Sequence, residues 1–100
     1  MSEPVYLLVL GYGFTEAYYK LSTEERADLW SKVGEVDNRA GAKFLIACNS
    51  RWADESIYDW GVLEYPGMEA YQQKVKELEK LECWRYFSTK TILGTKMDNS

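Results

Sequence analysis

The feature that most constrains the fold is the order of strand-like and helix-like patterns along a chain of only 100 residues. Apolar runs rich in β-branched and aromatic residues, each followed by turn-forming residues, occupy the segments 5–10, 42–48, 57–65 and 83–93. Two segments with helical periodicity separate the first run from the second and the third run from the fourth. The predicted order of elements is therefore β-α-β-β-α-β.

The first helical segment has a clear start and a clear end. Ser22 and Glu25 are spaced as in a capping box, in which each side chain hydrogen-bonds the backbone amide of the other residue. Gly41 supplies the left-handed residue that commonly ends a helix. Apolar residues recur between them at helical spacing: Leu29, Trp30, Val33, Val36 and Ala40.

The second helical segment follows the strand-breaking pair Pro66 and Gly67. Its apolar residues recur at intervals of three and four: Met68, Tyr71, Val75, Leu78 and Leu81. Polar residues are predicted to form its solvated outer face: Gln72, Lys74, Lys76, Glu77, Glu79 and Lys80. The sequence thus predicts an amphipathic helix.

This order, with right-handed crossovers, predicts an α+β fold of the ferredoxin-like type, with both helices on one face of a four-stranded antiparallel sheet. We expect one domain over residues 1–100, with its core at about 4–94 and a frayed tail at 95–100. No predicted element remains to cover the other face of the sheet. A second copy of the chain would cover it, so we expect a homodimer.

Charge and hydropathy exclude several classes of partner. The formal net charge is -4 at pH 7 and no run of Lys or Arg forms a basic patch, so no nucleic acid and no anionic membrane is expected as a partner. The N-terminal residues lack a basic segment, and the apolar run at 5–10 is too short for a signal peptide or a membrane span. We therefore expect a cytoplasmic protein.

The sequence contains no histidine, which removes several kinds of active site. A proximal haem ligand, a His-ligated zinc and a Ser-His or Cys-His nucleophile are all excluded. Cys48 and Cys83 are too few for a disulfide scaffold and are expected to be reduced, buried thiols. Carboxylates alone would have to hold a metal ion, so we predict no metal and no cofactor.

The stretch ACNSRWADESIYDW, at 47–60, concentrates polar and aromatic side chains between two predicted strands. Its Ala-Asp-Glu-Ser centre is turn-like, which predicts the tip of a β-hairpin. A turn centred on 53–56 pairs cross-strand residues so that one face gathers Asn49, Arg51, Tyr58, Trp60 and Glu64. In this register Asn49 lies opposite Trp60, and Asp59 lies on the other face.

These residue types suit general-base chemistry on a phenolic or polyketide substrate. Forming an enolate or phenolate needs a base and donors that hold the oxyanion. Glu64 is the candidate base, Arg51 is a candidate catalytic cation, and Asp59 is the competing base if the pocket opens on the other face. Asn49, Tyr58 and Trp60 are candidate substrate contacts. Alternatively this face is the dimer interface, where Trp, Tyr and Arg are enriched.

The connection at 11–21 is rich in aromatic residues for a solvated loop. Its rings are Tyr12, Phe14, Tyr18 and Tyr19, and we expect them to fold back as a lid that contacts the substrate. Trp30, on the first helix, is expected in the core or at the border of the pocket.

Two stretches of the chain carry a family resemblance in addition to the order of elements. LSTEERA at 21–27, after the aromatic loop, and WRYF at 84–87, running to ILG at 92–94, resemble the small darcynin-like members of the dimeric α+β-barrel superfamily. The resemblance covers about residues 4–94. It implies that two ferredoxin-like protomers join their sheets into a dimeric α+β barrel.

The resemblance also bears on activity. Antibiotic-biosynthesis monooxygenase-like relatives oxidise aromatic or polyketide-type substrates without metal or flavin. Haem-degrading relatives need a His on the second helix, where this chain has Tyr71 and Gln72. The implied function is a small cofactor-independent enzyme that oxygenates, cyclises or isomerises an aromatic or polyketide-like molecule. The alternative is a non-catalytic homodimer that binds a small hydrophobic ligand or acts as an accessory module.

Overall fold

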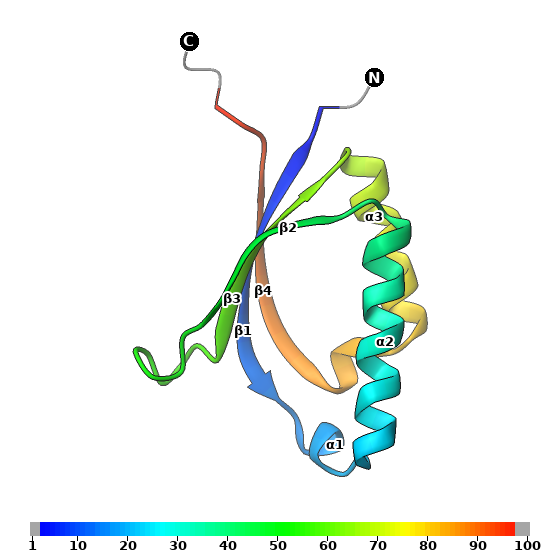
Figure 1. The fold of residues 1–100 in the computed structure, drawn as a ribbon, viewed down its shortest axis with the longest axis vertical. Coiled ribbons are helices and arrows are strands. Elements are labelled where there is room, and N and C mark those ends of the chain that lie inside the picture. The colour runs from blue at the N-terminus through cyan, green and yellow to red at the C-terminus, as the bar shows by residue number, and fades with distance from the viewer. Residues whose placement is uncertain (1–2, 98–100) are drawn as a thin grey trace.

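The computed structural model describes residues 3–97 and consists of a four-stranded antiparallel sheet with helices packed against it (Figure 1). In chain order the elements are β1 (Val5–Phe14), α1 (Glu16–Tyr19), α2 (Thr23–Arg39), β2 (Lys43–Asn49), β3 (Asp59–Tyr65), α3 (Met68–Lys80), the 3-10 helix η1 (Cys83–Arg85) and β4 (Phe87–Gly94). The predicted α+β class is confirmed. The long elements follow the predicted order, and α1 and η1 are additional short helices.

The strands lie side by side in the order β2-β3-β1-β4. Strand β1 pairs with β3 on one side and with β4 on the other, while β2 pairs with β3, and every pairing is antiparallel. Both long helices, α2 and α3, lie on the same side of this sheet in Figure 1. The arrangement is compatible with a ferredoxin-like fold.

Helix α2 begins and ends where its sequence signals predict. The Ser22 hydroxyl accepts the amide hydrogen of Glu25 at 3.0 Å, and the Glu25 carboxylate accepts that of Ser22 at 2.8 Å. After the C-cap Ala40, Gly41 has a φ of 75°, a left-handed conformation that side chains disfavour. The predicted capping box and glycine stop are both confirmed.

The aromatic connection at 11–21 is not the irregular lid that the sequence predicted. Strand β1 continues through it to Phe14, because Gly13, with a φ of 108°, permits a bulge that restores pairing with β4. Helix α1 follows directly, capped by the Thr15 side chain. The connection is therefore held against the body of the protein by regular hydrogen bonds.

The last predicted strand begins later than expected. Residues 83–85 form η1, and β4 starts only at Phe87. Glu82, whose φ of 56° is left-handed, turns the chain after α3 and sets up this short helix. A short apolar and aromatic run does not distinguish strand from helix by periodicity, so Trp84 and Tyr86 were wrongly predicted to lie on a strand.

The hydrophobic core is divided into two clusters. One joins the helices and the aromatic connection through the buried residues Tyr18, Leu29, Val36, Leu78 and Cys83. The other lies where the sheet meets α3, through the buried residues Leu7, Leu63 and Tyr65. Both cysteines are free, with Cys83 buried and Cys48 half-buried. Residues 95–97 have no regular structure, and the rest of the predicted tail lies outside the described residues.

The other face of the sheet is left open by the described part of the chain (Figure 1). Because strand residues alternate between faces, the neighbours of buried Leu7 and Leu63 point toward this side. The open face carries a largely apolar set of side chains: Tyr6, Leu8, Leu10, Ile46, Cys48, Trp60, Val62 and Ile92. Large apolar patches of this kind mark interaction surfaces in soluble proteins.

Candidate functional site

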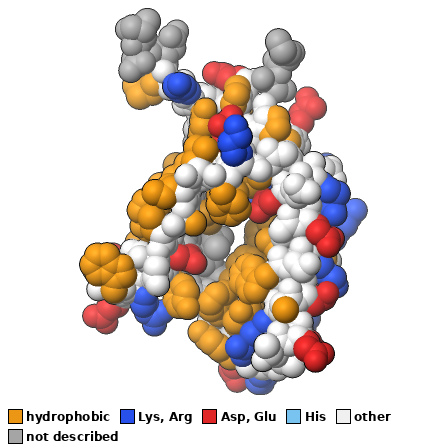
Figure 2. Space-filling model, viewed as in Figure 1, with side chains coloured by type: hydrophobic (Ala, Val, Ile, Leu, Met, Phe, Trp, Pro, Cys, Tyr) orange, Lys and Arg blue, Asp and Glu red, His pale blue; other side chains and the backbone are white. Residues whose placement is uncertain are grey.

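A cavity of about 510 Å³ lies between the helix-bearing face of the sheet and helices α2 and α3. Figure 2 shows the hollow in the middle of the molecule, bordered by hydrophobic side chains on both sides. Strands β1, β3 and β4 form its floor, and the two helices and η1 form its roof. This volume is typical of pockets that bind small molecules.

One end of the cavity is walled by aromatic rings from elements far apart in the sequence. The rings of this set are Phe14, Trp30, Tyr58, Trp84 and Phe87, and the cavity lining also includes the rings of Phe44 and Tyr71. The Phe14 ring lies 6.0 Å from that of Trp30 and 5.3 Å from that of Tyr58, edge to face. Phe87 stacks on Trp30 at 5.4 Å, and Trp84 lies 5.7 Å from Phe87. These contacts hold the rings in a fixed arrangement.

The aromatic connection supports this wall from behind. Tyr18 is buried, stacks on Phe14 at 4.2 Å and accepts a hydrogen bond from Trp30 Nε1 at 3.0 Å. The Arg26 guanidinium packs over the Tyr18 ring at 5.0 Å and donates to the Tyr19 carbonyl. Of the four predicted lid rings, only Phe14 lines the cavity, while Tyr12 and Tyr19 are exposed outside it.

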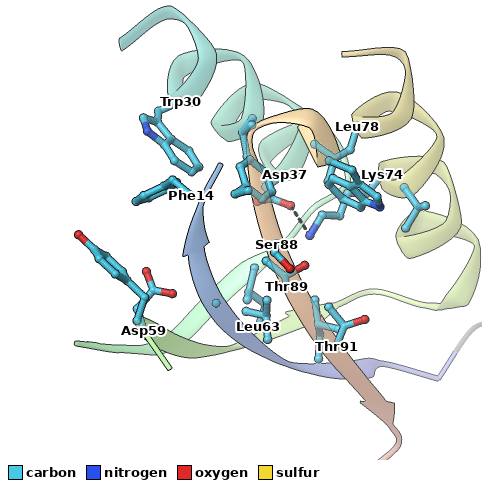
Figure 3. Close-up of a pocket in the computed structure, with 18 of the residues that line it drawn as sticks. Phe14, Trp30, Asp37, Asp59, Leu63, Lys74, Leu78, Ser88, Thr89 and Thr91 are labelled. Atoms are coloured by element: carbon cyan, nitrogen blue, oxygen red, sulfur yellow. Dashed lines mark ion pairs between the residues drawn. The ribbon is translucent and has the colours of Figure 1, made fainter. Parts of the chain in front are cut away.

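Asp59 places a carboxylate at the aromatic end of the cavity (Figure 3). It starts β3 opposite Gly11 of β1, and its Oδ1 occupies the space that a Cβ on Gly11 would fill. Within residues 3–97 the Asp59 side chain forms no ion pair and no hydrogen bond. The side chain remains open to solvent, and its partial burial raises the pKa of the carboxyl group above its ordinary value.

Hydroxyl groups line the floor beside Asp59. Thr89 of β4 lies opposite Gly11 on the side away from Asp59, so the three residues form a row across the sheet. Ser88 and Thr91 of the same strand also line the cavity (Figure 3). A ligand above Gly11 would therefore have a proton acceptor on one side and a hydroxyl donor on the other.

A largely buried polar cluster marks the inner end of the cavity. Lys74 of α3 forms an ion pair with Asp37 of α2 at 3.3 Å and donates a hydrogen bond to the Tyr65 hydroxyl at 2.6 Å. Tyr65 in turn donates to Asp37 Oδ1 at 3.0 Å. Burial, followed by the Asp37 charge, raises the pKa of Tyr65, so its phenol keeps its proton.

The predicted hairpin register is wrong by one residue. Asn49 pairs with Asp59, and Trp60 pairs with Cys48. The turn is longer than predicted, because the third strand begins at Asp59 and residues 50–58 form the loop. Asn49 therefore shares a face with Asp59 rather than with Glu64.

Because of this difference in register, the residues that were predicted to share one face do not lie together. Glu64 pairs with Tyr6 on the open face of the sheet, outside the cavity. Arg51 is exposed in the loop, with its guanidinium 5.3 Å from the Tyr58 ring. Asn49 and Trp60 line a neighbouring depression of about 390 Å³ that also touches Tyr58 and Asp59. The main cavity thus contains Phe14, Trp30, Tyr58 and Asp59 from the predicted set.

Sequence reasoning missed the polar cluster. Lys74 was predicted on the solvated face of α3, yet its side chain is only 12% exposed. The sequence contained a sign of this cluster, because both charged residues continue the apolar stripe of their helix. Lys74 lies between Tyr71 and Leu78 at helical spacing. Asp37 follows Trp30 and Val33 at the same spacing. Charged residues on an apolar helical stripe therefore pointed to the cavity.

Comparison with known proteins does not assign a family. No family model matches the sequence, and no curated protein matches it. Within residues 3–97, no group of three or more His, Cys, Asp or Glu side chains is placed to hold a metal ion. In the same part of the chain, no helix combines the length and apolarity needed to cross a membrane.

Proposed function

We propose that the protein is a small cofactor-independent enzyme that binds an aromatic or polyketide-like molecule in the cavity and uses Asp59 as a general base. The observation that carries this proposal is a carboxylate without a protein partner, within residues 3–97, at the aromatic end of the cavity. Planar apolar ligands pack well against such rings. A raised pKa also brings the carboxyl group closer to the range in which a base works at neutral pH.

The chemical step is the transfer of one proton. Asp59 takes the proton from an acidic C–H or phenolic O–H of the substrate, which leaves an enolate or phenolate. Hydroxyl groups that border the same region, those of Thr89 and Tyr58, are the candidate donors to the resulting oxyanion. Return of the proton from Asp59 to another substrate atom completes an isomerisation. Attack of the anion on a second carbonyl instead closes a ring, and the alkoxide that forms takes the proton back from Asp59. Oxygenation additionally consumes dioxygen.

The experiment uses 5-nitrobenzisoxazole, an aromatic probe that needs only a base. Removal of its ring C–H proton breaks the N–O bond and forms a nitrile, so the ring opens to the coloured 2-cyano-4-nitrophenolate, which absorbance follows directly. We expect the reaction to be faster with the wild-type protein than with acetate at the same concentration. The rate with Asp59→Asn should be at least about tenfold lower than with the wild type.

The control is Glu55→Gln, which removes an exposed carboxylate from the same hairpin outside the cavity. It should react like the wild type. Equal rates for Asp59→Asn and the wild type would exclude Asp59 as the base. Tight binding of naphthalene probes without any turnover of the nitrobenzisoxazole would favour the non-catalytic alternative.

A second role is supported by the open face of the sheet. We infer that two copies of the chain join these apolar faces, as in the dimeric α+β-barrel superfamily of ferredoxin-like protomers that the sequence resembles. Leu8, at the centre of the face, is flanked by Val62 and Ile92. Glu64 pairs with Tyr6 on this open face, which is consistent with the interface role that the sequence left open for it. Such a homodimer is compatible with catalysis and with the accessory-module alternative.

A further inference from the structure

We propose that the cluster of Lys74, Asp37 and Tyr65 is a binding site for a neutral carbonyl oxygen of the ligand. The proposal rests on the aromatic-ligand function proposed above and extends it to the opposite end of the cavity. It defines the ligand as an elongated aromatic ketone, or a related carbonyl compound, that spans the cavity from Asp59 to Lys74.

The hydrogen bonds of the cluster leave one donor unused. The protonated Tyr65 hydroxyl donates a hydrogen bond to Asp37, so its oxygen is free to accept a hydrogen bond from Lys74. The Lys74 ammonium has three N–H groups: one donates to Tyr65, and the ion pair with Asp37 Oδ1 at 3.3 Å accounts for at most one other. Within residues 3–97 the remaining N–H has no acceptor. Figure 3 shows the Lys74 ammonium beside Asp37, above the strand that carries Ser88 and Thr89.

Little water reaches this unused donor. The side chains of Lys74 and Asp37 are 12% and 14% exposed, and both line the cavity. The ammonium lies 5.1 Å from the centre of the Tyr65 ring and 5.9 Å from that of Tyr71, so rings rather than water surround much of it. A donor with little access to water and no protein partner is unfavourable, and a ligand oxygen would remove that cost.

Charge determines which oxygen fits. Asp37 already neutralises Lys74, and Asp59 adds a second carboxylate to the cavity lining. A carboxylate on the ligand would therefore enter a cavity with an excess of negative charge. A neutral carbonyl accepts the free N–H without this repulsion.

The length of the ligand follows from helix geometry. Trp30 at the aromatic end and Asp37 at the inner end both line the cavity and are seven residues apart on α2. Seven residues correspond to two turns and a rise of about 10.5 Å, so the two ends lie on one side of the helix. A fused two-ring system with a carbonyl substituent spans such a distance.

The test compares 2-acetylnaphthalene with 2-ethylnaphthalene, which has nearly the same shape but no carbonyl oxygen. Binding is measured by calorimetry and by quenching of tryptophan fluorescence, since Trp30 and Trp84 line the cavity. We expect the wild type to bind 2-acetylnaphthalene about tenfold more tightly, the effect of one hydrogen bond to a charged donor. The variant Lys74→Met should bind both probes equally.

Removing Lys74 alone leaves Asp37 buried without its partner and can prevent folding. The double variant Asp37→Asn with Lys74→Met removes both charges together, and its helix content is checked by circular dichroism. Loss of the preference in the folded double variant, with unchanged binding of 2-ethylnaphthalene, supports the proposal. Equal affinity of the wild type for the two probes would overturn the carbonyl site alone. Failure of both probes to bind the wild type would overturn the proposed aromatic-ligand function together with it.

Discussion

At the scale of single residues, Gly11 makes the position of Asp59 sterically possible. Gly11 is buried in the central strand, and any side chain there would overlap the Asp59 carboxylate. Its carbonyl oxygen also accepts the amide hydrogen of Tyr58 at 2.7 Å, which fixes the residue that precedes Asp59. A glycine within a strand commonly marks such a close approach. Gly11 thus leaves room for the carboxylate over the floor of the cavity.

The raised pKa of Asp59 predicts a pH-dependent effect on stability. Because the folded protein holds this proton more tightly than the unfolded chain, the free energy of unfolding falls as pH rises from the ordinary pKa of 3.8 through the folded pKa. Asp59→Asn removes this pH-dependent contribution to the free energy of unfolding. We therefore expect the variant to be more stable than the wild type at pH 7 and to lose that advantage below about pH 3.8. Urea denaturation at a series of pH values measures the difference.

The matched control for this experiment is Asp28→Asn, an exposed carboxylate that pairs with Lys32. It should not gain stability at pH 7, since it loses a favourable surface ion pair. An Asp59→Asn protein that is less stable than the wild type at pH 7 would show that the carboxylate stabilises the fold. If Asp59 serves function rather than folding, the Asp59→Asn variant should gain stability and lose the proton-transfer activity.

The residues of the site could be predicted only in part. Phe14, Trp30, Tyr58 and Asp59 were all candidates from sequence, because aromatic and carboxylate side chains are conspicuous in a short chain. Glu64 was preferred to Asp59 because the pairing of the hairpin was misjudged by one residue. In a strand such a slip exchanges the faces, so the choice of base depended on a register that the turn sequence did not define.

At the scale of elements, the capping box determines where α2 begins. This helix carries Trp30 at one end of the cavity and Asp37 at the other. Ser22→Ala removes the hydroxyl that accepts the Glu25 amide, which should lower the free energy of unfolding by about 1 kcal/mol. Chemical denaturation measures the loss.

Ser31→Ala is the matched control, since Ser31 is exposed in the interior of the same helix. This substitution should be neutral or slightly stabilising, because alanine has the higher helix propensity. Binding of 2-ethylnaphthalene should be unchanged in both variants at low denaturant concentration. A loss for Ser31→Ala as large as that for Ser22→Ala would show that the capping bonds are not the cause.

At the scale of the whole molecule, the sheet has one face covered by helices and one that residues 3–97 leave open. Strand β2 is poorly protected, since Phe44, Leu45 and Ile46 are all about half exposed or more. Such an edge and face are typical of an interaction surface. We expect wild-type protein to sediment as a dimer of the 11.6 kDa chain.

Val62→Lys places a charge at the centre of the open face and should convert this dimer to a monomer. Glu24→Lys, on the exposed surface of α2, changes charge more strongly and should leave the dimer intact. Sedimentation equilibrium gives the masses, and 2-ethylnaphthalene binding shows whether the cavity persists in the monomer. A wild-type protein that remains monomeric at high concentration would exclude the proposed dimer.

The sequence by itself determined the features that depend on neighbours along the chain. The order of elements and the limits of α2 follow from periodicity, a capping box and a glycine, which act within a few residues. The absence of histidine likewise excludes whole classes of chemistry, because no fold can supply a side chain that the chain lacks.

Only the tertiary structure decided the hairpin register, the cavity between two separate core clusters, and the contact of Lys74 with Asp37 and Tyr65. Each of these joins residues from different elements, and the pattern of one segment does not specify its partner in another. Many pairings satisfy the same local pattern, and packing of the complete chain selects one of them.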